Sequence, residues 1–204
     1  MTQIQGQSLS KRYGYQWIIR ELDLEFNTGS IHGIAGGNGS GKSTLIKMLS
    51  GFLSPTSGWI TYTIGHKTIP VQRIFPYISL VAPYTDMINE FTLKEVVDFH
   101  GKFKPFKRKF SYQELEDIIQ LKGHGDKTLQ NFSSGMKQKV QLALGLLSDT
   151  PILLLDEPTA YLDKNAKSWF TELLSAANPD TLVVIASNDT FDLDLCQEIL
   201  YLDQ

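Results

Sequence analysis

The sequence has a single cysteine, Cys196, among its 204 residues. One thiol cannot form an internal disulfide or a thiolate metal cage, which suits a reducing compartment. We expect it to be a buried structural thiol. Neither sign of charge dominates, because 19 basic and 22 acidic residues leave a formal charge of −3. No global positive field therefore attracts nucleic acid or acidic lipid, and any such contact must be local.

Long hydrophobic runs are also missing. The most apolar stretches, such as 152–155 and 182–186, are far shorter than the roughly 20 residues that cross a bilayer. The first twenty residues contain no apolar stretch of the length that a secretory signal requires. We therefore expect no export signal and no membrane span, so that a second chain must supply the span if the protein serves a membrane. Internal repeats and low-complexity linkers are absent as well.

What the sequence does contain is enough apolar material for a core, with 42% hydrophobic residues in a length that suits one domain or one domain with a subdomain. Leu22, Leu24 and Phe26 alternate with acidic residues, which predicts a half-buried strand. The rest of the first part reads as short strands around one helix. The expected strands are 30–35, 58–64 and 78–82, and the expected helix is 42–49.

The middle of the chain is predicted to be helical. Capping boxes at 92–95 and 111–114 place a hydroxyl and a carboxylate where helices begin. A third helix, with a broad apolar face, should run from Ser133 to about Leu147. Strands return at 152–155, 181–186 and 198–202, with a helix at 165–177. Because strands and helices alternate, we expect a mostly parallel sheet covered on both faces and a helical insert at about 86–145.

A glycine-rich loop lies between the predicted strand 30–35 and the helix after it. It fits the pattern G-x-x-x-x-G-K-S, in which backbone N–H groups turn toward phosphate oxygens. Lys42 would bring its charge to the β- and γ-phosphates, and the Ser43 hydroxyl would ligate Mg²⁺. The residues expected to bind the nucleotide here are Gly36, Gly37, Asn38, Gly39, Ser40, Gly41, Lys42, Ser43 and Thr44.

Two carboxylates end the apolar strand at 152–155. In an open parallel sheet, ligands gather at the carboxyl ends of the strands, so Asp156 should lie beside the phosphate loop and hold Mg²⁺. Glu157 comes next and is the expected general base for an attacking water. The sequence therefore predicts a nucleoside triphosphate and Mg²⁺ as cofactors, with Ser43 and Asp156 as the metal ligands.

With these motifs, residues 132–138 resemble the LSGGQ-type signature of the ATP-binding cassette (ABC) family, although only Ser133 and Gly135 match it strictly. The resemblance extends over essentially the whole chain and implies the ATP-binding subunit of an ABC transporter. The implied fold is an α/β P-loop NTPase with a mostly parallel sheet, an N-terminal antiparallel β region and a helical insert. It implies a single nucleotide-binding domain over 1–204, with its core at 1–85 and 146–204 and its helical subdomain at about 86–145.

The same resemblance implies partners. Ser133, Ser134 and Gly135 would complete the nucleotide site of a second cassette, so that two cassettes form a homodimer or heterodimer around two ATP molecules. Residues 160–163 look like the D-loop that crosses this interface, and Tyr13 looks like the aromatic residue that stacks on adenine. A membrane-spanning transporter subunit in a separate chain is implied, with this chain peripheral on the cytoplasmic face of the membrane.

Two positions depart from the family pattern. Pro83 lies at or beside the position of a glutamine, and Asn188 replaces the histidine that contacts the γ-phosphate. Proline supplies no side-chain oxygen, and asparagine donates a hydrogen bond but cannot become cationic. Two hypotheses follow. In the first, which we favour, Glu157 still drives a slower hydrolysis and Asn188 is a further catalytic residue. In the second, a partner cassette does most of the hydrolysis. His100 and His124 are expected at the surface and not in the site.

A basic aromatic run covers residues 102–110, with five cations between phenylalanines. This run predicts a solvated loop between two helices, with the phenylalanines anchoring the loop. A membrane-proximal face and a nucleic-acid contact are the alternatives. The second alternative belongs to a different function, a soluble ABC-type ATPase or nucleotide switch that acts on nucleic acid or ribosomes. Nucleic acid is the less expected partner, since such proteins usually carry two cassettes or long coiled-coil arms.

Overall fold

The computed structural model describes residues 1–176 and 179–202. Within them the chain forms two compact units. The first contains Met1–Leu80, Thr150–Glu157 and the C-terminal stretch after residue 178, and the second contains Val81–Asp149 and residues 158 to 176. Each unit has its own secondary structure and is described by itself.

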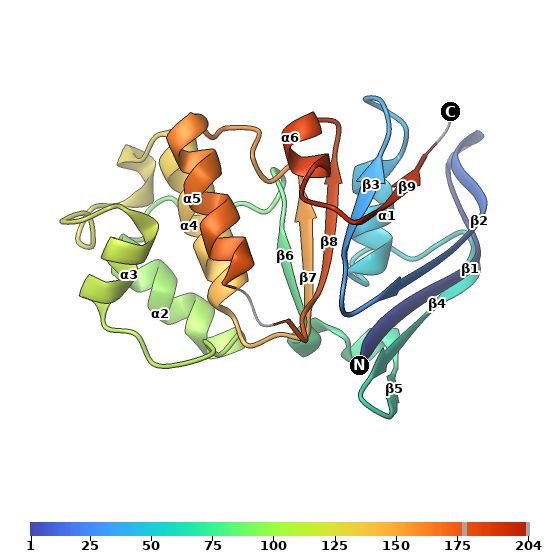
Figure 1. The fold of residues 1–204 in the computed structure, drawn as a ribbon, viewed down its shortest axis with the longest axis horizontal. Coiled ribbons are helices and arrows are strands. Elements are labelled where there is room, and N and C mark those ends of the chain that lie inside the picture. Colours follow the sequence, from blue (N-terminus) through green and yellow to red (C-terminus); the bar gives the residue numbers. More distant parts are fainter. Residues whose placement is uncertain (177–178, 203–204) are drawn as a thin grey trace. The chain divides into compact units, whose positions relative to one another are not determined.

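The N-terminal part of the first unit is an antiparallel sheet with the strand order β2-β1-β4-β5 (Figure 1). The predicted alternation is confirmed, since Phe26 is buried, Leu22 and Leu24 are half-buried, and the acidic residues between them are exposed. The strands of this sheet are β1 (Thr2–Tyr13), β2 (Gln16–Asn27), β4 (Ser57–Ile64) and β5 (Lys67–Ile69).

A second sheet in the same unit has the order β6-β7-β8-β3-β9 and carries the site. Strand β3 pairs in parallel with β8 and β9, and β7 pairs in parallel with β8. Strands β7 and β8 are buried along their whole length, as expected for a parallel sheet covered on both faces. The strands are β3 (Ile31–Ala35), β6 (Ile78–Val81), β7 (Ile152–Asp156), β8 (Leu182–Ser187) and β9 (Glu198–Tyr201).

The described residues of this unit also form the helices α1 (Lys42–Leu49) and α6 (Thr190–Leu193). Helix α1 buries Leu45, Ile46 and Leu49 in a core shared with Ile34, Leu154 and other residues of the parallel sheet. The burial of these side chains fixes α1 against the sheet, because each contributes about 1.5–3 kcal/mol by leaving water. The loop before α1 is therefore held at both ends, by β3 and by a buried helix.

The second unit is helical, with α2 (Leu93–Phe103), α3 (Tyr112–Ile119), α4 (Ser134–Leu147) and α5 (Lys164–Ser175). Both predicted capping boxes are present, at Thr92 with Glu95 and at Ser111 with Glu114. Ser133 caps α4, as expected. The predicted helix 165–177 begins one residue earlier and ends at Ser175, and its residue 177 lies outside the described residues.

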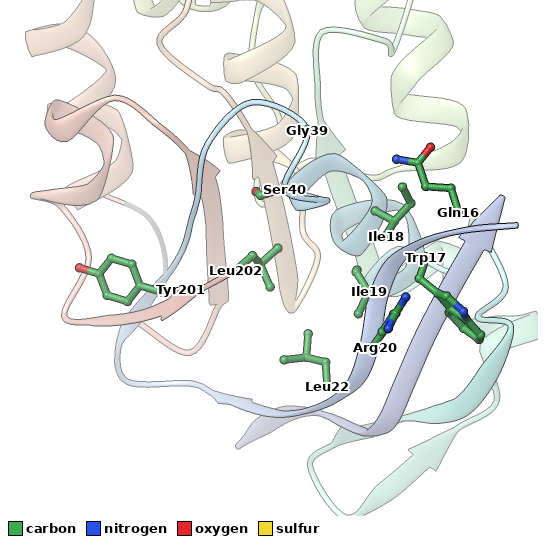
Figure 2. Close-up of a pocket in the computed structure, with 10 residues that line it drawn as sticks. All are labelled: Gln16, Trp17, Ile18, Ile19, Arg20, Leu22, Gly39, Ser40, Tyr201 and Leu202. Carbon is green, nitrogen blue, oxygen red and sulfur yellow. The ribbon is translucent and has the colours of Figure 1, made fainter. Parts of the chain in front are cut away.

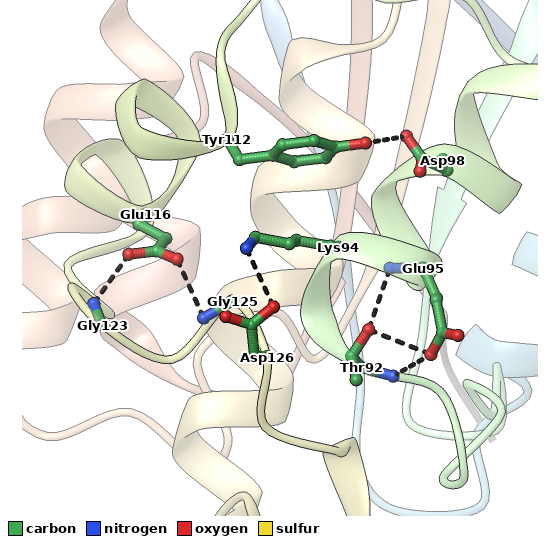
Figure 3. A network of polar contacts seen from close by, with 9 residues as sticks. All are labelled: Thr92, Lys94, Glu95, Asp98, Tyr112, Glu116, Gly123, Gly125 and Asp126. Atoms are coloured by element: carbon green, nitrogen blue, oxygen red, sulfur yellow. Dashed lines mark hydrogen bonds and ion pairs between the residues drawn. The ribbon is translucent and has the colours of Figure 1, made fainter.

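Polar contacts join α2, α3 and the loop after α3 (Figure 3). The Tyr112 hydroxyl donates to Asp98 at 2.6 Å, which ties the start of α3 to α2. Lys94 of α2 donates to Asp126 at 2.9 Å, and Glu116 accepts two backbone N–H groups of the loop. These contacts hold the loop that leads toward α4.

Short 3₁₀ turns complete the described structure: η1 (Val71–Arg73), η2 (Phe75–Tyr77) and η3 (Leu129–Asn131). Among the helices in residues 1–176 and 179–202, none has the length and hydrophobicity needed to cross a membrane.

Candidate nucleotide site

The glycine-rich loop connects β3 to α1 in the way the sequence predicts. Gly39 and Gly41 have φ angles of +86° and +103°, which only glycine adopts without strain. A Cβ atom at Gly41 would lie 2.9 Å from Ile18 Cγ2, so this position excludes larger residues for a second reason. Gly41 is the N-cap of α1, and the first N–H groups of that helix are directed at the loop. This geometry suits an anion at the helix start.

Lys42 crosses this loop with a buried side chain that is 7% exposed. Its ammonium group donates to the carbonyl oxygens of Gly36 at 2.8 Å and Gly37 at 3.2 Å. The lysine thus holds the two ends of the turn together and keeps its charge at the centre of the loop. Gly37 and Gly39 are exposed and have open space on the side where a Cβ atom would stand.

The loop and the strand ends offer ligands that fit a magnesium nucleotide. The Ser40 hydroxyl is buried and has no hydrogen-bond partner among the described residues. It could donate a hydrogen bond to a phosphate oxygen. Ser43 is exposed at the start of α1, and Asp156 is fully buried at the end of β7. A hydroxyl and a carboxylate are hard oxygen donors, which Mg²⁺ prefers.

Glu157 follows Asp156 and lies close to the phosphate loop. Its Oε1 atom is 3.7 Å from the Lys42 ammonium nitrogen. The residue has a φ of +47°, which is strained for a residue with a side chain, and its N–H donates to the Ala186 carbonyl at 2.8 Å. The structure therefore brings Lys42 and Glu157 together, two residues that are far apart in the chain.

The end of β8 adds a residue that the motif analysis missed. The Ser187 hydroxyl lies 2.9 Å from Glu157 Oε2 and 2.7 Å from Asp192 Oδ2, and it accepts the Asp189 N–H at 3.0 Å. A serine at the end of an apolar strand carries no pattern that points to a site. The parallel pairing of β7 with β8 could have suggested Ser187 as a site residue, because this pairing puts the ends of both strands side by side.

Asn188 also reaches the phosphate loop. Its Nδ2 atom donates to Asn38 Oδ1 at 3.1 Å, and both side chains are exposed. Asn188 is therefore turned toward the loop, whereas its neighbour Ser187 contacts Glu157.

A pocket of about 640 Å³ opens beside the loop (Figure 2). Its walls come from β2, from the loop, from the last residue of β9 and from the residue after it. Trp17 and Arg20 line it, and the Arg20 guanidinium lies 5.8 Å from the centroid of the Trp17 ring. Tyr13, expected to stack on adenine, is 51% exposed with the Lys11 ammonium 5.4 Å from its ring. The pocket residues are Gln16, Trp17, Ile18, Ile19, Arg20, Leu22, Gly39, Ser40, Tyr201 and Leu202.

The signature residues lie in the second unit, at the start of α4. Ser133 and Ser134 are exposed, and the Ser133 hydroxyl accepts the Met136 N–H at 3.2 Å. A Cβ atom at Gly135 would lie 3.0 Å from the Tyr161 carbonyl oxygen, which leaves little room for a side chain. Asp163 caps α5 by accepting the Ala166 N–H at 2.8 Å, the ordinary role for an aspartate there.

Pro83 lies in an exposed turn directly after β6. The Thr85 hydroxyl closes this turn, since it donates to the Ala82 carbonyl at 2.6 Å and accepts the Ala82 N–H at 3.2 Å. The turn needs no N–H from its second residue, so proline fits it.

The basic aromatic run is less solvated than the sequence suggested. It begins inside α2, Lys104 is only 7% exposed, and the Lys107 ammonium donates to the Leu146 carbonyl at 2.9 Å. Burial lowers the pKa of Lys104 to about 8. Phe106 anchors the loop as expected, because it stacks on His100 with 5.6 Å between ring centroids.

The expectation that His100 is a surface residue was wrong. It is partly buried, and its ring lies 2.7 Å from the Ser148 hydroxyl. Burial, followed by the charge of Lys104, lowers the pKa of His100 to about 4, so the ring is neutral at pH 7. His124 is also partly buried, against the Phe132 ring at 5.9 Å. No sequence pattern predicts these ring contacts, which depend on how the loops fold back.

Cys196 is half-buried, and its thiol donates to the Asp192 carbonyl at 3.5 Å. Burial, and then the charge of Asp192, raise the pKa of this thiol to about 11. Little thiolate forms at neutral pH, which agrees with the expected structural role.

A glycine-rich loop before a helix, with a buried lysine beside strand-end carboxylates, defines a P-loop nucleotide-binding protein. The family model for ABC transporters matches residues 19–160. The chain therefore belongs to the ABC transporter family.

Relatives agree with this assignment. The probable sulfate/thiosulfate import ATP-binding protein CysA of Chlorella vulgaris is 32% identical over 97% of this chain and 86% of that protein. The Nod factor export ATP-binding protein I of Rhizobium johnstonii is 31% identical over 81% of this chain and 54% of that protein. Other curated relatives are longer too, and the chain spans 52% and 20% of two of them.

Solved structures share the fold. The dimeric structure of the bacterial ABC transporter cassette MJ0796 has a TM-score of 0.82 and 24% identity, over 98% of this chain and 94% of that one. The same cassette in a post-hydrolysis state bound to ADP and Pi has a TM-score of 0.82 at 23% identity. The predicted resemblance, the P-loop NTPase fold and the assignment to a family of ATPases are confirmed.

Proposed function

We propose that this chain binds and hydrolyses ATP as the ATP-binding subunit of an ABC transporter. It closes as a dimer on Mg-ATP and drives a membrane-spanning subunit in a separate chain, from the cytoplasmic face of the membrane. The proposal rests on the 3.7 Å distance between Lys42 Nζ in the phosphate loop and Oε1 of Glu157, which directly follows strand β7.

In the bound state, the backbone N–H groups of residues 37–43 and the Lys42 ammonium hold the phosphates. Ser43 and Asp156 would hold Mg²⁺, which neutralises phosphate charge when it is bound. The aromatic residue Tyr13 or the pocket beside Trp17 receives the adenine. Ser133, Ser134 and Gly135 act on the nucleotide of the partner cassette, since they offer hydroxyls and free N–H groups at a helix start.

Glu157 is the general base that takes a proton from the attacking water. Asn188 donates a neutral hydrogen bond near the phosphates, where a histidine could carry charge. Charge-assisted bonds are roughly twice as strong as neutral ones, so hydrolysis is slower than with a histidine. Pro83, which brings no side-chain oxygen to the turn after β6, slows it further.

Turnover of ATP by the purified chain tests the central step. With Mg²⁺, we expect turnover that Glu157→Gln abolishes, since the amide cannot accept the proton. The matched control is Glu172→Gln, which makes the same change at an exposed residue of α5 and should leave turnover unaltered. Turnover that persists in Glu157→Gln contradicts the role of this residue as base.

Transport itself needs a second experiment. The protein isolated from native membranes should copurify with a chain that has several apolar spans of about 20 residues. Copurification with ribosomes or nucleic acid at moderate salt, without an integral membrane chain, would instead favour a soluble ATPase.

A further inference from the structure

Ser187 makes the contacts expected of a residue that holds another in place. It is the last residue of β8 and is fully buried. Its hydroxyl oxygen lies 2.9 Å from Glu157 Oε2 and 2.7 Å from Asp192 Oδ2, and it accepts the Asp189 N–H at 3.0 Å. The oxygen therefore accepts one N–H group, and its single hydrogen is shared between two carboxylates.

Glu157 is a residue that needs such support. Its backbone has a φ of +47°, and its side chain is 25% exposed at the end of β7. Strained backbones persist only where surrounding contacts over-determine them. One oxygen of the carboxylate faces Lys42 at 3.7 Å, and the other faces Ser187. Lys42 is expected to turn to the phosphates when nucleotide binds, which leaves Ser187 as the hold on the carboxylate.

The neighbouring Asn188 does not share this task, because its amide donates to Asn38 of the phosphate loop at 3.1 Å. We infer that Ser187 is the positioning residue for Glu157, with Asp192 and Asp189 fixing the serine oxygen from the other side. The inference rests on the proposed function, in which Glu157 is the base. It extends that function by a residue that acts on the reaction through Glu157.

A positioning role predicts a particular kinetic change. Ser187→Ala should lower kcat for ATP by about 10- to 150-fold, the range expected for one lost hydrogen bond to a charged group. KM for ATP and the affinity for Mg-ATP should stay within about threefold, because the phosphate loop is unchanged. Ser187→Thr retains the hydroxyl and should recover most of the lost kcat.

Two further variants separate positioning from stability. Ser187→Cys nearly keeps the volume but is a weak donor, so it should lower kcat even if Ser187→Ala does not fold. Ser79→Ala removes another buried serine hydroxyl of the same unit, which lies 2.8 Å from the Thr150 hydroxyl and away from the site. This control should lose stability without losing kcat.

The double variant gives the decisive readout. In the Glu157→Asp background, in which the shortened carboxylate no longer reaches Ser187, Ser187→Ala should not lower the remaining turnover further, because the serine acts only through Glu157. If wild-type turnover does not depend on Glu157, the proposed function fails. If it does, but Ser187→Ala and Ser187→Cys keep kcat within about threefold, or the two changes add in the double variant, the positioning inference alone is overturned.

Discussion

Replacing Lys42 by alanine should weaken the binding of Mg-ATP strongly. The Lys42 side chain is 7% exposed, and its ammonium group donates to two loop carbonyls at 2.8 and 3.2 Å, so it is already in place when phosphate arrives. A hydrogen bond to a charged group contributes about 1.5–3 kcal/mol. The loss should therefore raise Kd by about 10- to 150-fold.

Isothermal titration calorimetry with Mg²⁺ and ATP measures this change, in the Glu157→Gln background so that the nucleotide is not consumed. The control is Lys47→Ala, which removes the same charge about 7.5 Å further along α1 and should keep Kd within about twofold. Circular dichroism checks that both variants are folded. A folded Lys42→Ala protein whose Kd is within threefold of its background would refute the assignment of the phosphate loop.

Two further predictions concern stability and pH. Gly58→Ala should destabilise the fold by about 1–3 kcal/mol or more in urea unfolding, because φ is +80° and a Cβ atom would collide with carbonyl oxygens of β1. Gly65→Ala, with φ +62° and open space around it, should lower the free energy of unfolding clearly less than Gly58→Ala does. Equal losses of stability in the two variants would contradict the collision at Gly58. Burial, and then the charge of Lys104, lower the pKa of His100 to about 4 in the folded protein. The unfolded chain therefore binds this proton more readily. The contribution of His100 to stability is complete above about pH 6.5 and is lost as the pH falls toward 4. The stability of the wild type relative to His100→Gln should therefore fall by about 1–3 kcal/mol between pH 7 and 4, whereas a constant difference would show that His100 is not buried.

Local chemistry explains what the sequence could predict. The capping residues of α2 and α3 act within four positions of one another, and the glycine-rich loop carries its own turn geometry, so both follow from short patterns. The alternation at β2 and the apolar runs of β7 and β8 report burial directly.

The surroundings of the site depend on contacts between distant segments. His100 is a neutral, partly buried ring because Ser148, which is 48 residues further along the chain, contacts it and because the loop after α2 folds back over it. Trp17 lines the pocket beside the loop only because β2 passes there. Secondary-structure propensity and hydrophobic periodicity do not predict such contacts between distant residues.

The amino-acid sequence by itself determined the family, the phosphate loop and the identity of the acidic residues, because each is written in a contiguous stretch of chain. Tertiary structure alone decided that Ser187 holds Glu157 and that Asn188 faces Asn38. These pairs are joined by the order of strands in a parallel sheet, and that order is set by burial and pairing across the whole unit.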